Sequence, residues 1–194
     1  MGKAEKTRQF VIEKSAPIFN KRGYAGTSLT DLIEATGLTK GSIYGNFENK
    51  DEVALEAFRF NVRKMAQHFN SAMDIKVSYR EKLLVYPDMY ERFYSDGFLD
   101  GGCPILNTSV EADDTYPVLK LIAKKAFLNW KSSIAGLIEE GQKNGEFKAT
   151  NNPEQIAFII LAIIEGTTMI AKLMDDEKHI KNVTEHLRLL INGL

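Results

Sequence analysis

The feature that most constrains the fold of this chain is the recurrence of apolar residues at helical spacing along nearly its whole length. In one clear stripe, Leu55, Phe58, Val62, Met65 and Phe69 follow one another at intervals of three and four residues. Such spacing places them on one face of an amphipathic helix. The sequence holds no alternating pattern long enough for a strand, no internal repeat and no low-complexity tract. It therefore predicts an all-α fold.

Two short helical segments near the N-terminus are predicted at residues 28–36 and 40–46. The turn Gly37-Leu38-Thr39 separates them. Thr27 or Ser28 can cap the first segment and Thr39 the second, because each hydroxyl can accept a hydrogen bond from an unpaired backbone N–H. Two short helices joined by a tight turn with glycine have the geometry of a helix-turn-helix.

The helices on either side of this pair are longer. The first is expected to end at Gly23 and to be kinked by Pro17, which removes a hydrogen bond. The helix that follows the pair begins at Asn49 and runs to about residue 70. Further helical segments are predicted at about 79–95, from Cys103-Pro104, from Pro117, from Pro153 and at about 176–191.

The stretch of residues 71–78 is predicted to be a linker and indicates the boundary between two helical parts. Residues 1–50 are predicted to form a three-helix DNA-binding domain of the helix-turn-helix type. A fourth helix, about 50–70, connects this domain to the rest of the chain. Residues 71–194 are predicted to form a helical domain for ligand binding and dimerisation.

Composition and charge place the chain among soluble proteins. It has 194 residues, of which 44% are hydrophobic, and its longest apolar run has nine residues, against about 18 for a membrane span. A single cysteine, Cys103, excludes an intramolecular disulfide and a CxxC metal or redox motif. The N-terminus lacks the apolar segment of a secretory signal. We therefore expect a cytoplasmic protein without a membrane partner.

The charge of the chain is unevenly distributed. Residues 1–50 carry eight basic and five acidic residues, a net charge of +3, whereas the whole chain carries −1. The remainder therefore carries −4. A cationic N-terminal part indicates an anionic partner such as DNA, although asymmetry of this size also arises by chance.

The second short helix has one apolar face and one small, polar face. Lys40, Ser42, Tyr44 and Asn46 share the polar face, which suits a major groove because short side chains let a helix approach the bases. Periodicity alone leaves two other interpretations open. The pair can be two packed helices of a bundle, and the chain can be a helical adaptor that binds only proteins.

The residues themselves favour DNA binding. The stretch from Ala25 to Phe58 contains Gly37-Leu38-Thr39, Lys40-Gly41-Ser42-Ile43-Tyr44 and Asn49-Lys50 at fixed spacings. It closely resembles the DNA-binding domain of the TetR family of bacterial transcriptional repressors. This resemblance implies phosphate contacts at the starts of the second and fourth helices and by the Tyr44 hydroxyl, and base contacts by the other residues of the third helix. The implied DNA-binding residues are Thr27, Ser28, Thr39, Lys40, Gly41, Ser42, Tyr44, Gly45, Asn46 and Lys50.

A homodimer is expected to pair through the last two helices. Residues 156–164 are apolar around the whole helix, so the helix needs cover on both sides, from its own chain and from a partner. The alternative is a central helix wrapped entirely by its own chain. The family resemblance implies that the last two long helices of each protomer form a four-helix bundle. The predicted interface residues are Phe158, Leu161, Ile164, Val183, Leu187 and Leu190.

A cavity for a small-molecule inducer is expected among the middle helices. Aromatic and flexible apolar residues with a few polar groups suit such a site, although each is more often plain core. The candidates are Met89, Tyr90, Phe93, Cys103, Leu106, Asn107, Phe127, Trp130, Glu165 and Met169. The segment Gly101 to Pro117 resembles a TetR subgroup in which a Gly-Cys pair opens helix six. Cys103 at a helix N-terminus could then react with electrophiles.

An enzyme is not expected. The three histidines lack the HExxH spacing of a zinc site, and the chain has no nucleophile elbow, P-loop or dinucleotide fingerprint. We accordingly predict no catalytic residue, metal or cofactor. The leading prediction is a sequence-specific repressor that binds double-stranded operator DNA and is released by a small molecule. The alternatives are an adaptor without DNA binding and a regulator that senses electrophiles through Cys103.

Overall fold

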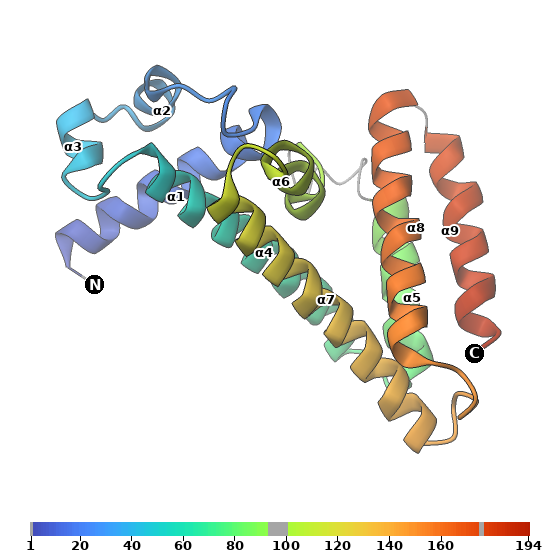
Figure 1. The fold of residues 1–194 in the computed structure, drawn as a ribbon. Coiled ribbons are helices and arrows are strands. Elements are labelled where there is room, and N and C mark those ends of the chain that lie inside the picture. The colour runs from blue at the N-terminus through green and yellow to red at the C-terminus, as the bar shows by residue number, and fades with distance from the viewer. Residues whose placement is uncertain (1, 93–100, 175–176) are drawn as a thin grey trace. The chain divides into compact units, whose positions relative to one another are not determined.

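The computed structural model describes residues 2–92, 101–174 and 177–194, and within these residues it contains helices and no strand (Figure 1). The all-α prediction is therefore confirmed. In chain order the helices are α1 (Lys3–Arg22), α2 (Leu29–Thr36), α3 (Lys40–Tyr44), α4 (Lys50–Asp74), α5 (Tyr79–Arg92), α6 (Pro104–Ala112), α7 (Pro117–Lys143), α8 (Pro153–Met174) and α9 (Glu177–Asn192).

The chain divides into two compact units that do not follow the chain order. One consists of Met1–Met65 with Leu99–Ala123, and the other of Ala66–Phe98 with Lys124–Leu194. Helices α4 and α7 each begin in the first unit and end in the second. The short helix α6 belongs to the first unit, with the N-terminal helices, although the chain reaches it only after α5. The linker predicted at 71–78 shortens to 75–78, because α4 continues to Asp74.

Side chains next to the helix ends fix the starts of the short helices. The Ser28 hydroxyl accepts a hydrogen bond from the Asp31 amide at 3.2 Å, and the Asp31 carboxylate accepts one from the Ser28 amide at 2.7 Å, which completes a capping box. Hydrogen bonds from the Ser28 hydroxyl and amide lower the pKa of the Asp31 carboxyl. Thr39 caps α3 by accepting from the Ser42 amide at 3.2 Å. The predicted caps at Ser28 and Thr39 are confirmed.

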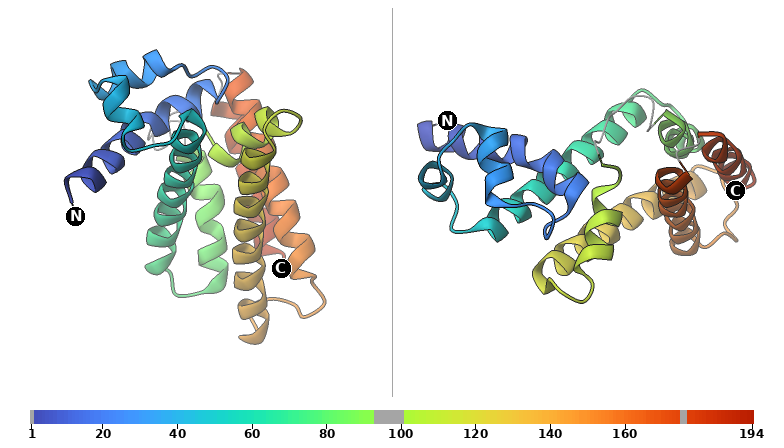
Figure 2. Two further views of the ribbon diagram at one scale, coloured as in Figure 1. Left: turned by 60° about the vertical axis from the view of Figure 1, so that its left-hand side comes forward. Right: turned by 90° about the horizontal axis from the view of Figure 1, so that it is seen from above.

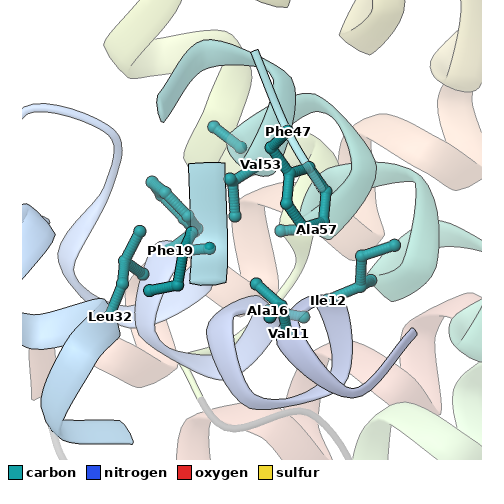
Figure 3. Packing of buried hydrophobic residues seen from close by; sticks show 10 residues of the cluster. Val11, Ile12, Ala16, Phe19, Leu32, Phe47, Val53 and Ala57 are labelled. Carbon is teal, nitrogen blue, oxygen red and sulfur yellow. The ribbon is translucent and has the colours of Figure 1, made fainter. Parts of the chain in front are cut away.

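Buried side chains from α1 to α4 form the core of the first unit, where they point toward one another (Figure 3). Helix α1 continues through Pro17 as far as Arg22. On α4, the Asn61 amide donates to the Ala16 carbonyl at 2.8 Å and ties α4 to α1. The core residues are Val11, Ile12, Ala16, Phe19, Leu32, Ile43, Phe47, Val53, Ala54 and Ala57.

In the second unit, α5, α8 and α9 lie side by side (Figures 1 and 2). The Arg188 guanidinium on α9 bonds the carboxylates of Asp88 and Glu91 on α5 at 2.9 and 2.5 Å. Within the described ranges, α8 alone is long and apolar enough to cross a membrane by length and composition. One face of α8 is nevertheless buried against its own chain, with Ile160, Leu161 and Ile164 at most 1% exposed.

Candidate nucleic-acid interface

Helices α2 and α3 form the helix-turn-helix that the sequence predicted. The three residues 37–39 join them, and Gly37 ends α2 in the left-handed conformation with φ at 66°. Ile43 of α3 and Phe47 just beyond it are at most 2% exposed, so one side of α3 is fixed in the core. The opposite side is thereby turned outward.

The outward side of α3 carries the small and polar residues. Lys40, Gly41 and Gly45 are exposed, and Ser42 and Tyr44 are half-buried. One cation, two glycines and two hydroxyls give this side a positive charge and make it polar. This combination matches the requirements of a helix that enters a major groove.

The space around Gly41 is open, so the fold itself leaves room for a side chain at this position. A Cβ added at Gly41 would meet only the Thr39 hydroxyl, at 4.0 Å. The fold therefore does not need a glycine here, and a glycine in a helix interior lowers stability relative to alanine. At Gly45, by contrast, an added Cβ would lie 3.1 Å from the Gly41 carbonyl oxygen, so packing within α3 already favours a small residue there.

Arg8 on α1 holds the backbone just after α3, and the sequence analysis missed it. Its guanidinium donates to the Asn46 carbonyl at 2.7 Å, pairs with the Glu52 carboxylate at 2.8 Å and lies over the Phe47 ring at 4.3 Å. The Asn46 side-chain amide in turn donates to the Ser42 carbonyl at 2.9 Å. Nothing in the sequence pattern pointed to this contact, because Arg8 and Asn46 lie 38 residues apart.

The structure separates the two residues predicted to contact phosphates at the start of α2. Ser28 is exposed. Thr27 is 0% exposed, and its hydroxyl donates to the Gly23 carbonyl at 2.6 Å. A phosphate contact by the Thr27 hydroxyl is therefore excluded in this conformation, because the buried side chain cannot reach DNA, and a contact by its backbone stays a prediction. Thr27 instead closes the loop between α1 and α2.

The ammonium group of Lys50 binds backbone carbonyls within the protein. It donates to the Tyr24 carbonyl at 2.7 Å and to the Thr27 carbonyl at 2.6 Å, and it lies 4.2 Å from the centre of the Tyr24 ring. Two of its three N–H donors are thus used on the loop between α1 and α2. A phosphate contact by Lys50 stays a prediction, with one donor left to make it.

Predicted inducer contacts in the second unit gather around a group of aromatic rings. The Phe69 ring lies 5.9 Å from that of Tyr90 and 6.0 Å from that of Trp130, measured between ring centres. Tyr86, which the sequence analysis did not single out, lies 5.0 Å from Phe69, and its burial raises the pKa of its hydroxyl. We call Phe69, Tyr86, Tyr90 and Trp130 the aromatic cluster.

The other residues predicted for the inducer site are scattered. Met89 and Glu165 are half-buried in the second unit, and Phe127 packs edge-on against Phe158 at 5.6 Å. Met169 is 54% exposed on the outer side of α8, away from the chain's own core. Phe93 lies outside the described residues.

Three predicted inducer contacts belong to α6 or its N-cap and thus to the first unit. Cys103 is 0% exposed, so an electrophile cannot reach its thiol in this conformation, which argues against the sensing alternative. The Asn107 amide donates to the carbonyls of Asn20 and Gly101 at 2.9 and 2.8 Å, a structural role. Leu106 is half-buried.

Hollows in the first unit are lined by residues other than those predicted for an inducer. One of about 370 Å³ lies between α1 and α2, with Lys21, Arg22 and Asp31 in its wall. Another of about 200 Å³ is lined by residues that include Tyr24 and Tyr116. Neither hollow includes a predicted ligand residue, so the position of the inducer site stays a prediction.

Half of the predicted dimer contacts face the protomer's own core. Leu161, Ile164 and Leu187 are at most 1% exposed, so their prediction as interface residues is wrong. The reason is that an all-apolar helix does not reveal which side its own chain covers. Phe158 is 54% exposed and thus free for a partner. The remaining two predicted contacts, Val183 and Leu190, are half-buried.

Comparison with protein families agrees with this architecture. Residues 11–57 match the model of bacterial regulatory proteins of the tetR family, and residues 80–187 match that of the tetracyclin repressor-like C-terminal domain. Together the two models span most of the chain. The boundary between them falls within residues 58–79, close to the linker predicted from the sequence.

Known proteins similar to this chain are regulators of the same kind. A TetR-family regulator structure from Cytophaga hutchinsonii is 44% identical, with a TM-score of 0.96, and covers 100% of this chain and 97% of that one. One from Chloroflexus aurantiacus is 33% identical, with a TM-score of 0.93 and coverage of 98% and 96%. The HTH-type transcriptional repressor DhaR of Mycobacterium sp. is 30% identical over 86% of this chain and 82% of its own length.

Proposed function

This chain belongs to the TetR family of bacterial transcriptional regulators, and from that premise we propose that it is a cytoplasmic repressor released from its operator by a small molecule. The observation that carries the proposal is the outward side of α3. It is small, polar and positively charged, and Gly41 keeps it free of bulk where the fold itself has room for a side chain. Neither an adaptor nor an enzyme needs such a surface.

The proposed DNA contacts follow from exposure. Lys40, Gly41 and Ser42 at the start of α3 face the base edges, as in helix-turn-helix proteins whose recognition helix enters the groove by its N-terminal residues. The remaining proposed contacts are Ser28, Thr39, Tyr44, Gly45, Asn46 and Lys50. Phosphate contacts displace counterions, so operator affinity falls steeply as salt increases.

The proposed dimer forms through the outer side of α8. Phe158, Ile159, Met169, Ile170 and Leu173 are between 40% and 77% exposed there. An apolar helix face of this length is unfavourable in water, and a second copy of the same face can cover it. A two-fold dimer then presents two recognition helices to half-sites about 34 Å apart.

The proposed inducer site adjoins the aromatic cluster in the second unit. Aromatic rings with a few polar groups are typical of small-molecule sites. The inducer releases the operator because it binds more tightly to the conformation that does not bind DNA. Trp130 is the only tryptophan of the chain, so its fluorescence reports directly on this cluster. A compound that weakens operator binding is expected to change that fluorescence.

Fluorescence anisotropy tests the proposal. The probe is labelled double-stranded DNA from upstream of the protein's own gene, titrated at two salt concentrations. The double variant Lys40→Ala/Tyr44→Ala removes two side chains from the outward side of α3, and Lys125→Ala on α7 serves as the control for loss of one exposed lysine. Because the Tyr44 ring also packs against the core of the first unit, circular dichroism must show that both variants are folded before their DNA binding is compared.

The expected result is tight, salt-sensitive binding that the double variant loses and the control keeps. If the upstream fragment does not bind, random DNA at low salt is titrated next. Salt-sensitive binding to random DNA that the double variant loses supports the proposal and indicates an operator elsewhere. Absence of binding to both DNAs contradicts the proposal, as does equal binding by the double variant.

A further inference from the structure

The loop of residues 23–28 between α1 and α2 is held by two opposite charges from other helices. On one side, the Glu111 carboxylate of α6 accepts hydrogen bonds from the amides of Tyr24 and Ala25, both at 2.8 Å. On the other side, the Lys50 ammonium of α4 donates to the carbonyls of Tyr24 and Thr27. The amide and the carbonyl of Tyr24 therefore bind opposite charges.

Gly23 provides the space that the Glu111 carboxylate occupies. A Cβ added at Gly23 would lie 2.5 Å from Glu111 Oε2 and 2.7 Å from Oε1, so a side chain here would displace the carboxylate from the loop. Gly23 also has φ at 74°, a conformation that L-residues rarely adopt. The loop is thus built to accept a carboxylate from α6 at this position.

The N-terminal end of α6 is attached to the same end of α1. The Asn20 amide donates to the Gly102 carbonyl at 2.8 Å, and the Asn107 amide donates back to the Asn20 carbonyl at 2.9 Å. A Cβ at Gly101 would lie 2.8 Å from the Asn20 carbonyl oxygen, so the chain before α6 approaches α1 closely. Two attachments, one near each end, therefore hold α6 against the end of α1.

The loop leads directly into the helix-turn-helix. Ser28 ends the loop and caps α2, and α2 leads within three residues to α3. Hydrogen bonds to charged groups are shorter and stronger than those between neutral groups. Two such bonds from Glu111 and two from Lys50 thus fix the backbone from which the helix-turn-helix starts.

We infer that Glu111 is a positioning residue for DNA binding, which acts with Lys50 through the loop of residues 23–28. This inference rests on the proposed function. Glu111 contacts no DNA in this arrangement, because its two carboxylate oxygens bind the loop. Loss of its charge frees the amides of Tyr24 and Ala25, and the helix-turn-helix then samples orientations that do not fit the operator.

The test compares Glu111→Gln with Asp114→Asn, an equal loss of charge at an exposed residue just after α6. Glutamine keeps the shape of the side chain but faces one loop amide with an N–H donor. We expect Glu111→Gln to lower operator affinity about tenfold with an unchanged salt slope, since no phosphate contact is lost. Hydrogen exchange of a peptide covering 23–27 is expected to accelerate, and Asp114→Asn is expected to match the wild type in both.

A third variant, Lys50→Met, separates positioning from phosphate contact and gives a double-mutant cycle. If Lys50 and Glu111 act through the same loop, the double variant loses less affinity than the two single losses combined. Strictly additive losses in the cycle would overturn the part of Lys50 in the inference, whereas a salt slope lower by about 0.9 per protomer in Lys50→Met would support the phosphate contact proposed for it above.

Two outcomes overturn the inference for Glu111. One is operator affinity for Glu111→Gln equal to that of Asp114→Asn, and the other is unchanged exchange at residues 23–27. If Glu111 had a purely structural role, Glu111→Gln would lower the thermal midpoint of unfolding. Operator affinity measured well below that midpoint would then be unchanged, and this result would also contradict the inference. If the wild type itself binds no DNA, the proposed function fails, whereas the exchange measurement still decides whether Glu111 holds the loop.

Discussion

The outward side of α3 and the outer side of α8 are both open to solvent, and each contains a glycine that the protomer does not need. An added Cβ would meet only an atom 4.0 Å away at Gly41 on α3 and nothing within 4 Å at Gly166 on α8. Their chemistry differs completely. The first surface is polar and cationic, whereas large apolar side chains such as Phe158 and Leu173 cover the second. Similar open space therefore suits the two different partners proposed above, DNA on α3 and a second protomer on α8.

Of the changes to the two surfaces, negative charge on the outer side of α8 is expected to lower operator affinity most. The double variant Ala162→Glu/Met169→Glu places two carboxylates on exposed positions of α8 and prevents a second copy from covering it. We expect a monomer in sedimentation experiments. Operator affinity is expected to fall on the order of 100-fold or more, because linked binding at two half-sites is lost.

Val77→Glu is the matched control for this variant. Val77 is 92% exposed in the linker after α4, so the same kind of substitution changes no packed surface there. This control is expected to remain a dimer. A dimer formed by the double variant would show that the protomers pair elsewhere.

Bulk on the α3 surface is expected to have the next largest effect. Gly41→Leu removes close approach to the bases, at a cost of about 1–3 kcal/mol, or roughly 5- to 150-fold in affinity. The same change replaces a helical glycine by a good helix former, so the thermal midpoint is expected to stay level or to rise. Anisotropy and circular dichroism measure the two effects.

Gly136→Leu on α7 is the control for Gly41→Leu, because an added Cβ there also meets nothing within 4 Å. It should bind the operator like the wild type. Wild-type affinity in Gly41→Leu would show that the outward side of α3 does not approach DNA closely. The open space at Gly41 would then have no part in DNA binding.

The smallest effect is expected at Thr39, which lies at the edge of the α3 surface. Thr39→Ala removes the cap of α3 and is expected to cost about 1 kcal/mol of folding stability. Thr39→Ser keeps the capping hydroxyl and should recover most of it. Operator titrations of both variants at several salt concentrations separate the cap from a phosphate contact. A lower salt slope in the alanine variant would add Thr39 to the phosphate contacts.

The two surfaces also show what the sequence could predict. The helix-turn-helix and the caps at Ser28 and Thr39 were predictable because polar residues and glycines mark positions along α2 and α3. On α8, apolar residues surround the helix, so the pattern could not separate buried Leu161 and Ile164 from exposed Phe158. The packing of α5, α7 and α9 against α8 decides which side is covered.

Contacts distant in sequence were beyond reach for a different reason. Glu111 binds amides 86 and 87 residues away, and Arg8 binds a carbonyl 38 residues away. Local periodicity holds no information on such pairs. The burial of Thr27 escaped prediction likewise, since a threonine beside a helix start is compatible with a cap, a phosphate contact or a loop closure.

Hydrogen exchange of the two surfaces, with and without operator DNA and at two protein concentrations, tests the central claim most directly. We predict that DNA slows exchange in a peptide covering residues 39–47. Dilution of the free protein should accelerate exchange in one covering residues 156–174 and leave 39–47 unchanged. If DNA instead leaves exchange at residues 39–47 unchanged, or slows exchange in α8 directly, then α3 is not the DNA-binding surface and the central claim is contradicted.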